Sequence, residues 1–175
     1  MFGVAAAVVA LAVWFVLRAP EYVAAEYRPD GRFRNYRRAL GEMGIDGSEL
    51  GSRWLAAADE AVAAEAERSG SLTGLPLEET VIFDPAEPEA AVYRFSIPRR
   101  REVVVSLETD VAPPRFFADL YRLSANGTAA PLKVATLDHE EGVLRIRTRR
   151  AGTYLFRVQP EIARGGRVRV QIDHH

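Results

Sequence analysis

The sequence predicts a mainly β protein with an α-helical N-terminal part: an antiparallel, jelly-roll-like β-sandwich preceded by a transmembrane or signal helix and a helical hairpin. Three observations predict this fold class. An unbroken apolar run opens the chain, apolar residues at helical spacing follow it, and short alternating segments separated by turn residues fill the C-terminal half. The 175 residues therefore divide into a membrane segment (1–20), a hairpin with its linker (21–76) and a sandwich domain (77–173).

The first segment is apolar from residue 2 to residue 17 and ends at Arg18. At 1.5 Å per residue its helix is roughly 24 Å long. This length is intermediate between that of a long signal peptide's apolar region and that of a short membrane anchor. Trp14 and Phe15 suit a membrane interface, and Val23-Ala24-Ala25 resembles a weak cleavage site, so a retained anchor and a cleaved signal both remain open. We predict membrane contact through residues 2–17.

The orientation of this segment is a separate question. Arginines follow the apolar run and none precedes it, which by the positive-inside rule alone would keep the body in the cytoplasm. Acidic residues are mixed among those arginines, and Met1 need not be the true start of the gene product. We expect a single-pass protein with a periplasmic or extracellular body.

The second segment has the spacing of two helices. Phe33, Tyr36, Leu40 and Met43 form one apolar stripe, and Gly44 is placed to end the helix. A second helix is predicted to begin at Asp46, with Glu49 completing a capping box. Its apolar face comprises Leu50, Trp54, Leu55, Ala58, Ala61 and Val62. Stripes this narrow do not make a domain, so the pair must pack on the β-domain or on a partner.

The third segment alternates with a period of two, which is typical of half-buried strands. Eight strands are predicted, near Thr80–Phe83, Ala91–Ile97, Glu102–Glu108, Phe116–Arg122, Leu132–Leu137, Val143–Thr148, Thr153–Gln159 and Arg167–Ile172. The predicted core comprises Tyr93, Phe95, Ile97, Val103, Val105, Leu107, Leu144, Ile146, Tyr154, Phe156, Val158, Val168, Val170 and Ile172. Many short strands between turn signals favour an antiparallel sandwich.

Composition excludes several classes of function. The 23 basic and 24 acidic residues nearly cancel, so no nucleic-acid partner is expected. The absence of cysteine excludes disulfides, Cys-ligated zinc and a thiol nucleophile. His139 falls in an acidic turn, and His174 with His175 closes the chain at an end expected to fray, so the histidines are a poor ligand set.

No catalytic constellation is found either. The sequence contains no nucleophile elbow, phosphate-binding loop or dinucleotide fingerprint. Four aspartates near strand ends suit turns, with a calcium site as the alternative: Asp84, Asp110, Asp119 and Asp138. We therefore predict no enzymatic activity, no cofactor and no metal for this chain.

One surface feature suggests binding. The outward positions of the last three predicted strands hold Arg145, Arg147, Arg157, Arg167 and Arg169. If these strands share a sheet, the arginines form a basic face for an anionic envelope polymer, phospholipid head groups or an acidic partner surface. The alternative is a solvated face balanced by nearby Glu and Asp.

Several of these segments resemble a known family. Tyr93-Arg94-Phe95, Val103-Val104-Val105, Asp119-Leu120-Tyr121 and Ala151-Gly152-Thr153-Tyr154 leading into Arg157-Val158 resemble bacterial pre-peptidase C-terminal domains. The resemblance covers residues 77–172 and implies a jelly-roll module of the kind attached to secreted proteases and other exported enzymes.

The helical part carries a second resemblance. Tyr36-Arg37-Arg38-Ala39-Leu40, Leu50-Gly51 and Trp54-Leu55-Ala56-Ala57 are similar to the region before the catalytic domain of some membrane-anchored M23-type metallopeptidases. This implies cell-wall work by a full-length family member. The His-x-x-x-Asp and His-x-His zinc motifs of those peptidases do not occur in the sequence.

The leading hypothesis is a non-catalytic, membrane-tethered extracytoplasmic accessory or binding module, associated with a cell-envelope peptidase. One alternative is the N-terminal part of an M23-type cell-wall metallopeptidase whose catalytic domain lies beyond residue 175. The other is a carbohydrate-binding sandwich. That function usually needs exposed aromatic side chains on one sheet face, for which only Phe117 and Tyr121 are candidates.

Overall fold

The computed structural model describes residues 32–68, 70, 72–110, 115–124, 130–137, 142–148 and 150–175. Two helices, α2 (Arg32–Glu42) and α3 (Glu49–Glu67), precede the strands. The strands are β1 (Leu77–Phe83), β2 (Ala91–Ile97), β3 (Glu102–Thr109), β4 (Phe116–Arg122), β5 (Leu132–Thr136), β6 (Val143–Arg147), β7 (Gly152–Pro160) and β8 (Gly166–His174). All eight predicted strands are therefore confirmed, with small differences at their ends.

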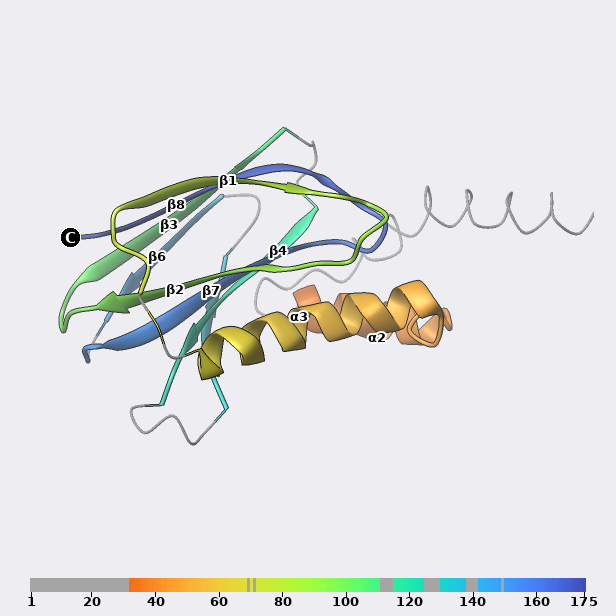
Figure 1. Cartoon of the computed structure of the whole chain (residues 1–175), viewed down its shortest axis with the longest axis horizontal. Helices are drawn as coiled ribbons and strands as arrows, with labels where there is room; N and C mark the ends of the chain where they lie inside the picture. The colour runs from red at the N-terminus through yellow and green to blue at the C-terminus, as the bar shows by residue number, and fades with distance from the viewer. Residues whose placement is uncertain are drawn as a thin grey trace, which may run out of the picture.

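The strands form two four-stranded antiparallel sheets packed face to face (Figure 1). One sheet has the order β1-β8-β3-β6 and the other has the order β2-β7-β4-β5. The chain changes sheet at every connection except the one between β4 and β5, which gives the strand order of an eight-stranded jelly roll. The predicted sandwich is confirmed.

The main core lies between the two sheets. Alternate residues of each strand point inward, as the period of two requires. Phe95, Val105 and Phe156 are fully buried there, and Phe83 packs on Phe116 with ring centroids 5.8 Å apart. Every member of the predicted core belongs to this cluster or packs against it.

The helices form for local reasons that the sequence shows only in part. Helix α2 buries Tyr36 and Leu40 on one face, and the chain leaves it through Gly44, whose φ of 69° favours glycine. The prediction that the second helix begins at Asp46 is wrong. Ser48 is its N-cap, since the Ser48 hydroxyl accepts a hydrogen bond from the Gly51 N–H at 3.0 Å.

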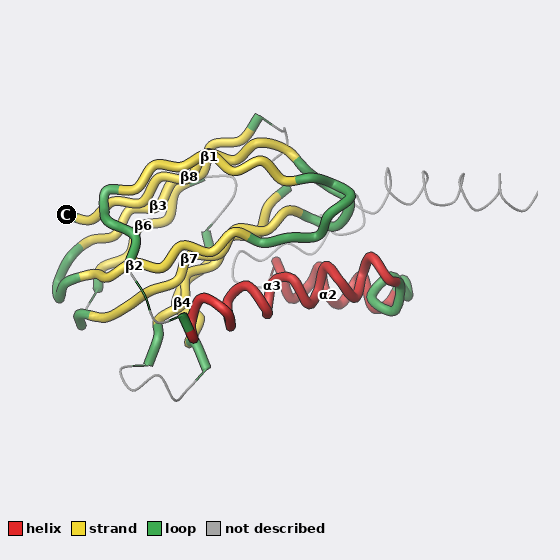
Figure 2. The backbone as a smooth tube through the Cα atoms, in the orientation of Figure 1, coloured by secondary structure: helices red, strands yellow, loops and turns green. Residues whose placement is uncertain are grey.

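The helical pair packs on the outer face of the β2-β7-β4-β5 sheet, and Figure 2 shows both helices on that side of the sandwich. Phe117 of β4 contacts the rings of Phe33, Tyr36 and Trp54 at centroid distances of 5.2, 5.0 and 5.9 Å. The predicted packing of the hairpin on the β-domain is confirmed. We call the β2-β7-β4-β5 sheet the covered sheet and the β1-β8-β3-β6 sheet the exposed sheet.

The predicted membrane segment, residues 2–17, lies outside the described residues. Within the part of the chain that the structure describes, no helix has the length and apolar character needed to cross a membrane.

Candidate functional site

The outer face of the exposed sheet presents polar side chains from all four of its strands. It is built from alternate residues of β1, β8, β3 and β6, whose neighbours point into the core. Arg145, Arg147, Arg167 and Arg169 all lie exposed on it. Because β6 and β8 both pair with β3, four of the five predicted arginines share this face.

Arg157 does not belong to this face, and its predicted outward, solvent-exposed position is wrong. It lies on β7, in the covered sheet, and only 1% of its surface is exposed. The helices cover the outer face of β7, so both faces of that strand are buried. The last three strands therefore do not share a sheet, and Arg157 is excluded from the candidate binding face.

Two of the remaining arginines, Arg147 and Arg169, stand beside carboxylates. Arg169 binds Glu78 on β1, and its guanidinium lies 3.7 Å from the Glu108 carboxylate on β3. Arg147 is directly opposite Glu102 in the register of β6 with β3. The hydrogen bond from Arg169 lowers the pKa of the Glu78 carboxyl group below its usual value, so the pair stays charged to a lower pH than a free carboxyl group would. The face is mixed in charge, not uniformly basic.

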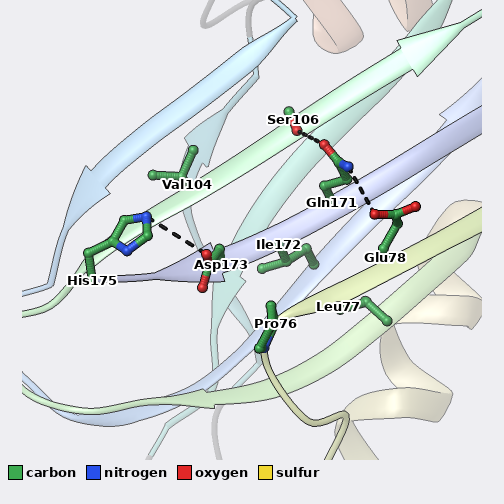
Figure 3. Close-up of a pocket in the computed structure, with 9 residues that line it drawn as sticks. All are labelled: Pro76, Leu77, Glu78, Val104, Ser106, Gln171, Ile172, Asp173 and His175. Carbon is green, nitrogen blue, oxygen red and sulfur yellow. Dashed lines mark hydrogen bonds and ion pairs between the residues drawn. The ribbon is translucent and has the colours of Figure 1, made fainter.

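A shallow hollow of about 380 Å³ lies on this face (Figure 3). Ser106 donates a hydrogen bond to the Gln171 side-chain oxygen at 3.1 Å, and the Gln171 amide donates to Glu78 at 3.1 Å. Asp173 and His175 lie at the other end of the hollow, with 3.8 Å between the imidazole Nε2 and the carboxylate. The hollow thus combines a ladder of fixed donors and acceptors with the small apolar side chain of Val104.

The C-terminal residues take part in this face. His174 is part of β8, and Glu102 and His175 exchange two backbone hydrogen bonds of 2.9 Å. The expectation of a frayed end at His174 and His175 is therefore wrong. Among the described residues, no group of three or more His, Cys, Asp or Glu side chains is arranged to hold a metal ion. His139 and Asp138 lie outside the described residues.

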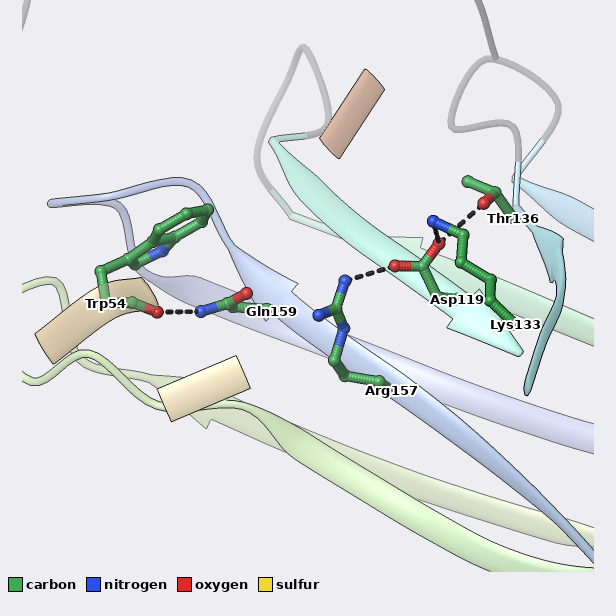
Figure 4. A network of polar contacts seen from close by, with 6 residues as sticks. All are labelled: Trp54, Asp119, Lys133, Thr136, Arg157 and Gln159. Carbon is green, nitrogen blue, oxygen red and sulfur yellow. Dashed lines mark hydrogen bonds and ion pairs between the residues drawn. The ribbon is translucent and has the colours of Figure 1, made fainter. Parts of the chain in front are cut away.

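A second polar cluster is buried under the helices (Figure 4). Arg157 binds Asp119 of the neighbouring strand β4, and Asp119 also contacts Lys133 Nζ and accepts a hydrogen bond from Thr136, each at 2.7 Å. The guanidinium of Arg157 lies 4.3 Å from the ring centroid of Phe33. This cluster joins α2 to the covered sheet. It assigns Asp119 a structural role in place of the calcium alternative.

Two hydrogen bonds from side chains to backbone carbonyl groups complete the attachment of α3. The Gln159 amide donates to the Trp54 carbonyl at 2.8 Å (Figure 4). The indole N–H of Trp54 donates to the Pro160 carbonyl, also at 2.8 Å. Sequence reasoning missed this cluster because Asp119 and Arg157 are 38 residues apart. The available signal was a charged residue within each of two otherwise apolar strands.

The candidate aromatic face for carbohydrate does not form. Phe117 is only 3% exposed, because the helices cover it. Tyr121 is partly buried on the same face, with the Arg157 guanidinium 5.8 Å from its ring centroid. These two rings are therefore not an exposed stacking platform, and the structure does not favour the carbohydrate alternative.

No family model and no curated protein matches the chain. Solved structures do match it. The chain is similar to the pre-peptidase C-terminal domain of a collagenase from Bacillus anthracis, with a TM-score of 0.47 and 12% identity over 61% of this chain and 99% of that chain. It is also similar to a periplasmic inhibitor of g-type lysozyme from Aeromonas hydrophila, with a TM-score of 0.41 and 10% identity over 62% and 92%. The sandwich assignment itself rests on the strand order of this chain.

Proposed function

We propose that the chain is a non-catalytic, extracytoplasmic accessory module, held at the membrane by residues 2–17, that presents its exposed sheet to a component of the cell envelope. One observation carries the proposal. The helical pair covers the outer face of one sheet, whereas the outer face of the other carries the hollow, the polar ladder and four exposed arginines. The chemistry of this face suits recognition of a polymer or protein with mixed polar groups.

Location is tested first with a single thiol. Because the chain contains no cysteine, Glu87→Cys in the exposed turn after β1 gives the protein one reactive group. A membrane-impermeant maleimide should label it in intact cells, and the protein should stay in the membrane pellet after alkaline extraction. The control Val105→Cys, buried in the core, should react only after denaturation. Labelling of Glu87→Cys only in lysed cells would place the folded part of the protein in the cytoplasm and contradict the proposal.

Binding is tested with two matched triple variants. Replacing Arg145, Arg147 and Arg169 with glutamine removes three positive charges from the exposed sheet, and replacing Arg34, Arg37 and Arg38 removes three from α2. Retention of the protein on purified cell wall should fall for the first variant and stay at the wild-type level for the second. Equal retention of all three proteins would contradict a binding role for the exposed sheet.

The finer part of the proposal is that the module serves a cell-envelope peptidase. It is supported by the resemblance of residues 36–57 and 77–172 to non-catalytic parts of exported peptidases. The reading frame after codon 175 tests the form in which both parts belong to one protein. A continuing frame that encodes His-x-x-x-Asp and His-x-His would support it, whereas a stop codon in the genomic sequence would rule that form out.

A further inference from the structure

The outer side of α2 is strongly basic. Tyr36 and Leu40 are buried against the covered sheet, so residues on the opposite side of the helix point away from the sandwich. Arg34 and Arg38, four residues apart, lie on that opposite side, and Arg37 lies on its flank; all three are exposed. The one acidic residue of α2 is Glu42, whose carboxylate lies 3.7 Å from Arg38.

The helix packed beside α2 does not share its basic charge. Helix α3 has one arginine, Arg53, and its acidic residues are Glu49, Asp59, Glu60, Glu65 and Glu67. On the exposed sheet Arg147 and Arg169 stand beside Glu78, Glu102 and Glu108. The outer side of α2 is therefore a described surface on which arginines outnumber carboxylates, as they also do in the exposed turn of residues 99–101 between β2 and β3.

The position of α2 in the sequence suggests which partner this charge fits. The apolar run ends at Leu17 and α2 begins at Arg32, so residues 18–31 join them. These residues include two arginines and three acidic residues, so the net basic charge of this region comes from α2. A fully extended chain of that length reaches at most about 50 Å. A basic helix face this close to a membrane segment is attracted by anionic lipids, and guanidinium groups pair well with phosphate.

We infer that the outer side of α2 docks on the anionic phospholipid head groups of the membrane that holds residues 2–17, an inference that rests on the proposed tether. Docking places the helical pair between the bilayer and the sandwich. Since the helices lie on the covered sheet, the exposed sheet then faces away from the membrane (Figure 1). The membrane contact thereby sets the direction in which the candidate binding face points.

The test uses the full chain reconstituted with vesicles. Glu42→Cys carries an environment-sensitive fluorophore at the exposed end of α2, and Thr80→Cys carries it on the exposed sheet as a reference. Vesicles of phosphatidylcholine alone are compared with vesicles in which a third of the lipid is phosphatidylglycerol. Flotation with neutral vesicles measures the tether, and the fluorescence change on adding anionic lipid measures docking.

The expected result is a membrane-like spectrum at position 42 with anionic lipid, its loss at high salt, and no change at position 80. Replacing Arg34, Arg37 and Arg38 with glutamine should lower the ratio of docked to undocked protein about 100-fold, or roughly fivefold for each arginine. The Arg145, Arg147 and Arg169 triple variant changes net charge equally and should dock like the wild type. Unchanged far-UV circular dichroism of both variants confirms that they fold.

The two proposals fail in different ways. If the chain floats with neutral vesicles, but the spectrum at position 42 does not change with anionic lipid or with the α2 substitutions, the tether is supported and the docking inference is overturned. If the chain floats with anionic vesicles but not with neutral ones, and the α2 substitutions abolish this flotation, the tether fails and the lipid-binding surface is supported. Failure to float with either vesicle overturns both.

Discussion

At the scale of single residues, Arg157 has the most demanding environment in the protein. Its guanidinium is buried between β4 and the helical pair, where it contacts the Asp119 carboxylate and the face of Phe33. A buried charge is tolerated only when a partner compensates the loss of its hydration. The Asp119 carboxylate is that partner, so the stability of the helix-covered face depends on it.

The first prediction concerns the loss of this partner. Asp119→Ala leaves the Arg157 guanidinium buried without its counter-charge and should lower the free energy of unfolding by about 3 kcal/mol or more. Urea denaturation followed by circular dichroism measures the change. The control Glu78→Ala removes the exposed partner of Arg169 and should leave the unfolding midpoint close to that of the wild type.

A double variant separates buried charge from lost packing. Replacing both partners, Asp119→Leu with Arg157→Met, removes the ion pair without leaving either charge alone. It should be clearly more stable than Asp119→Ala. A wild-type unfolding midpoint for Asp119→Ala itself would mean that Arg157 is not buried in solution.

The second prediction concerns alkaline pH. Burial is the main cause that raises the pKa of the Tyr36 hydroxyl above its usual value, and burial likewise raises the pKa of Tyr121 to about 12. In the unfolded chain both phenols lose their protons near pH 10, as ordinary tyrosines do. The folded protein then binds more protons than the unfolded chain, so the free energy of unfolding should fall as the pH rises above about 10.

Tyr36→Phe provides the matched variant. It removes the one hydroxyl that accepts the Ile162 N–H at 3.2 Å, which costs about 1 kcal/mol at neutral pH. Above pH 10 the free energy of unfolding of this variant should fall less steeply with pH than that of the wild type. The two slopes should differ by about 1.4 kcal/mol per pH unit, because only the wild type has the Tyr36 proton that the folded state retains. Equal slopes for the two proteins would show that Tyr36 ionises normally in the folded state.

At the scale of elements, β7 shows what a sequence pattern can and cannot predict. The alternation of Tyr154, Phe156 and Val158 correctly predicted which face of the strand is core. The opposite face was predicted to meet solvent, but Leu155, Arg157 and Gln159 are buried under the helices. A period of two assigns residues to two faces and does not say what covers each face. The aromatic cluster between the helices and the covered sheet was therefore visible only once the helices were placed.

The junction between α2 and α3 was also predicted only in part. The helices themselves follow from apolar spacing, whereas the N-cap is Ser48 and not Asp46, because the chain still runs through the connection before Ser48. Gly51 shows the reason. A Cβ atom at this position would lie 1.9 Å from the Ile45 carbonyl oxygen, so the connection between the helices passes against α3 at this one point.

The third prediction follows from that close approach. Gly51→Ala should lower the free energy of unfolding by about 2 kcal/mol, because the overlap with the Ile45 backbone outweighs the roughly 1 kcal/mol gained from helix propensity. Thermal unfolding measures the loss. Gly47→Ala, four residues earlier, is the control, since its nearest neighbour would be 4.0 Å away. Equal melting of the two variants would contradict the packing of the connection against α3.

At the scale of the whole molecule, the order of the strands determines which residues can meet. β7 and β8 are consecutive in sequence and alternate in the same way, a pattern that is compatible with neighbouring strands in one sheet. In the jelly roll the chain crosses to the other sheet between them, and β8 joins β1 and β3. Arg157 is thereby separated from Arg167 and Arg169. Local patterns predicted the strands and the sandwich, but the crossing connections that define the candidate face are long-range features.

The same architecture predicts that the protein unfolds as one unit. The helices share an aromatic cluster with β4, and Trp54 forms hydrogen bonds with both Pro160 and Gln159 of β7, so neither part loses contact with the other without exposing buried groups.

In a Trp14→Phe background, Trp54 is the one remaining tryptophan and reports the helical pair. Its fluorescence and the far-UV circular dichroism should change at the same urea concentration. The matched variant Phe117→Ala removes the ring that all three helix aromatics contact, and should shift both signals together to lower urea. If fluorescence changed at lower urea than circular dichroism, the helices would be a separately folding spacer, and residues 21–76 would be a domain of their own.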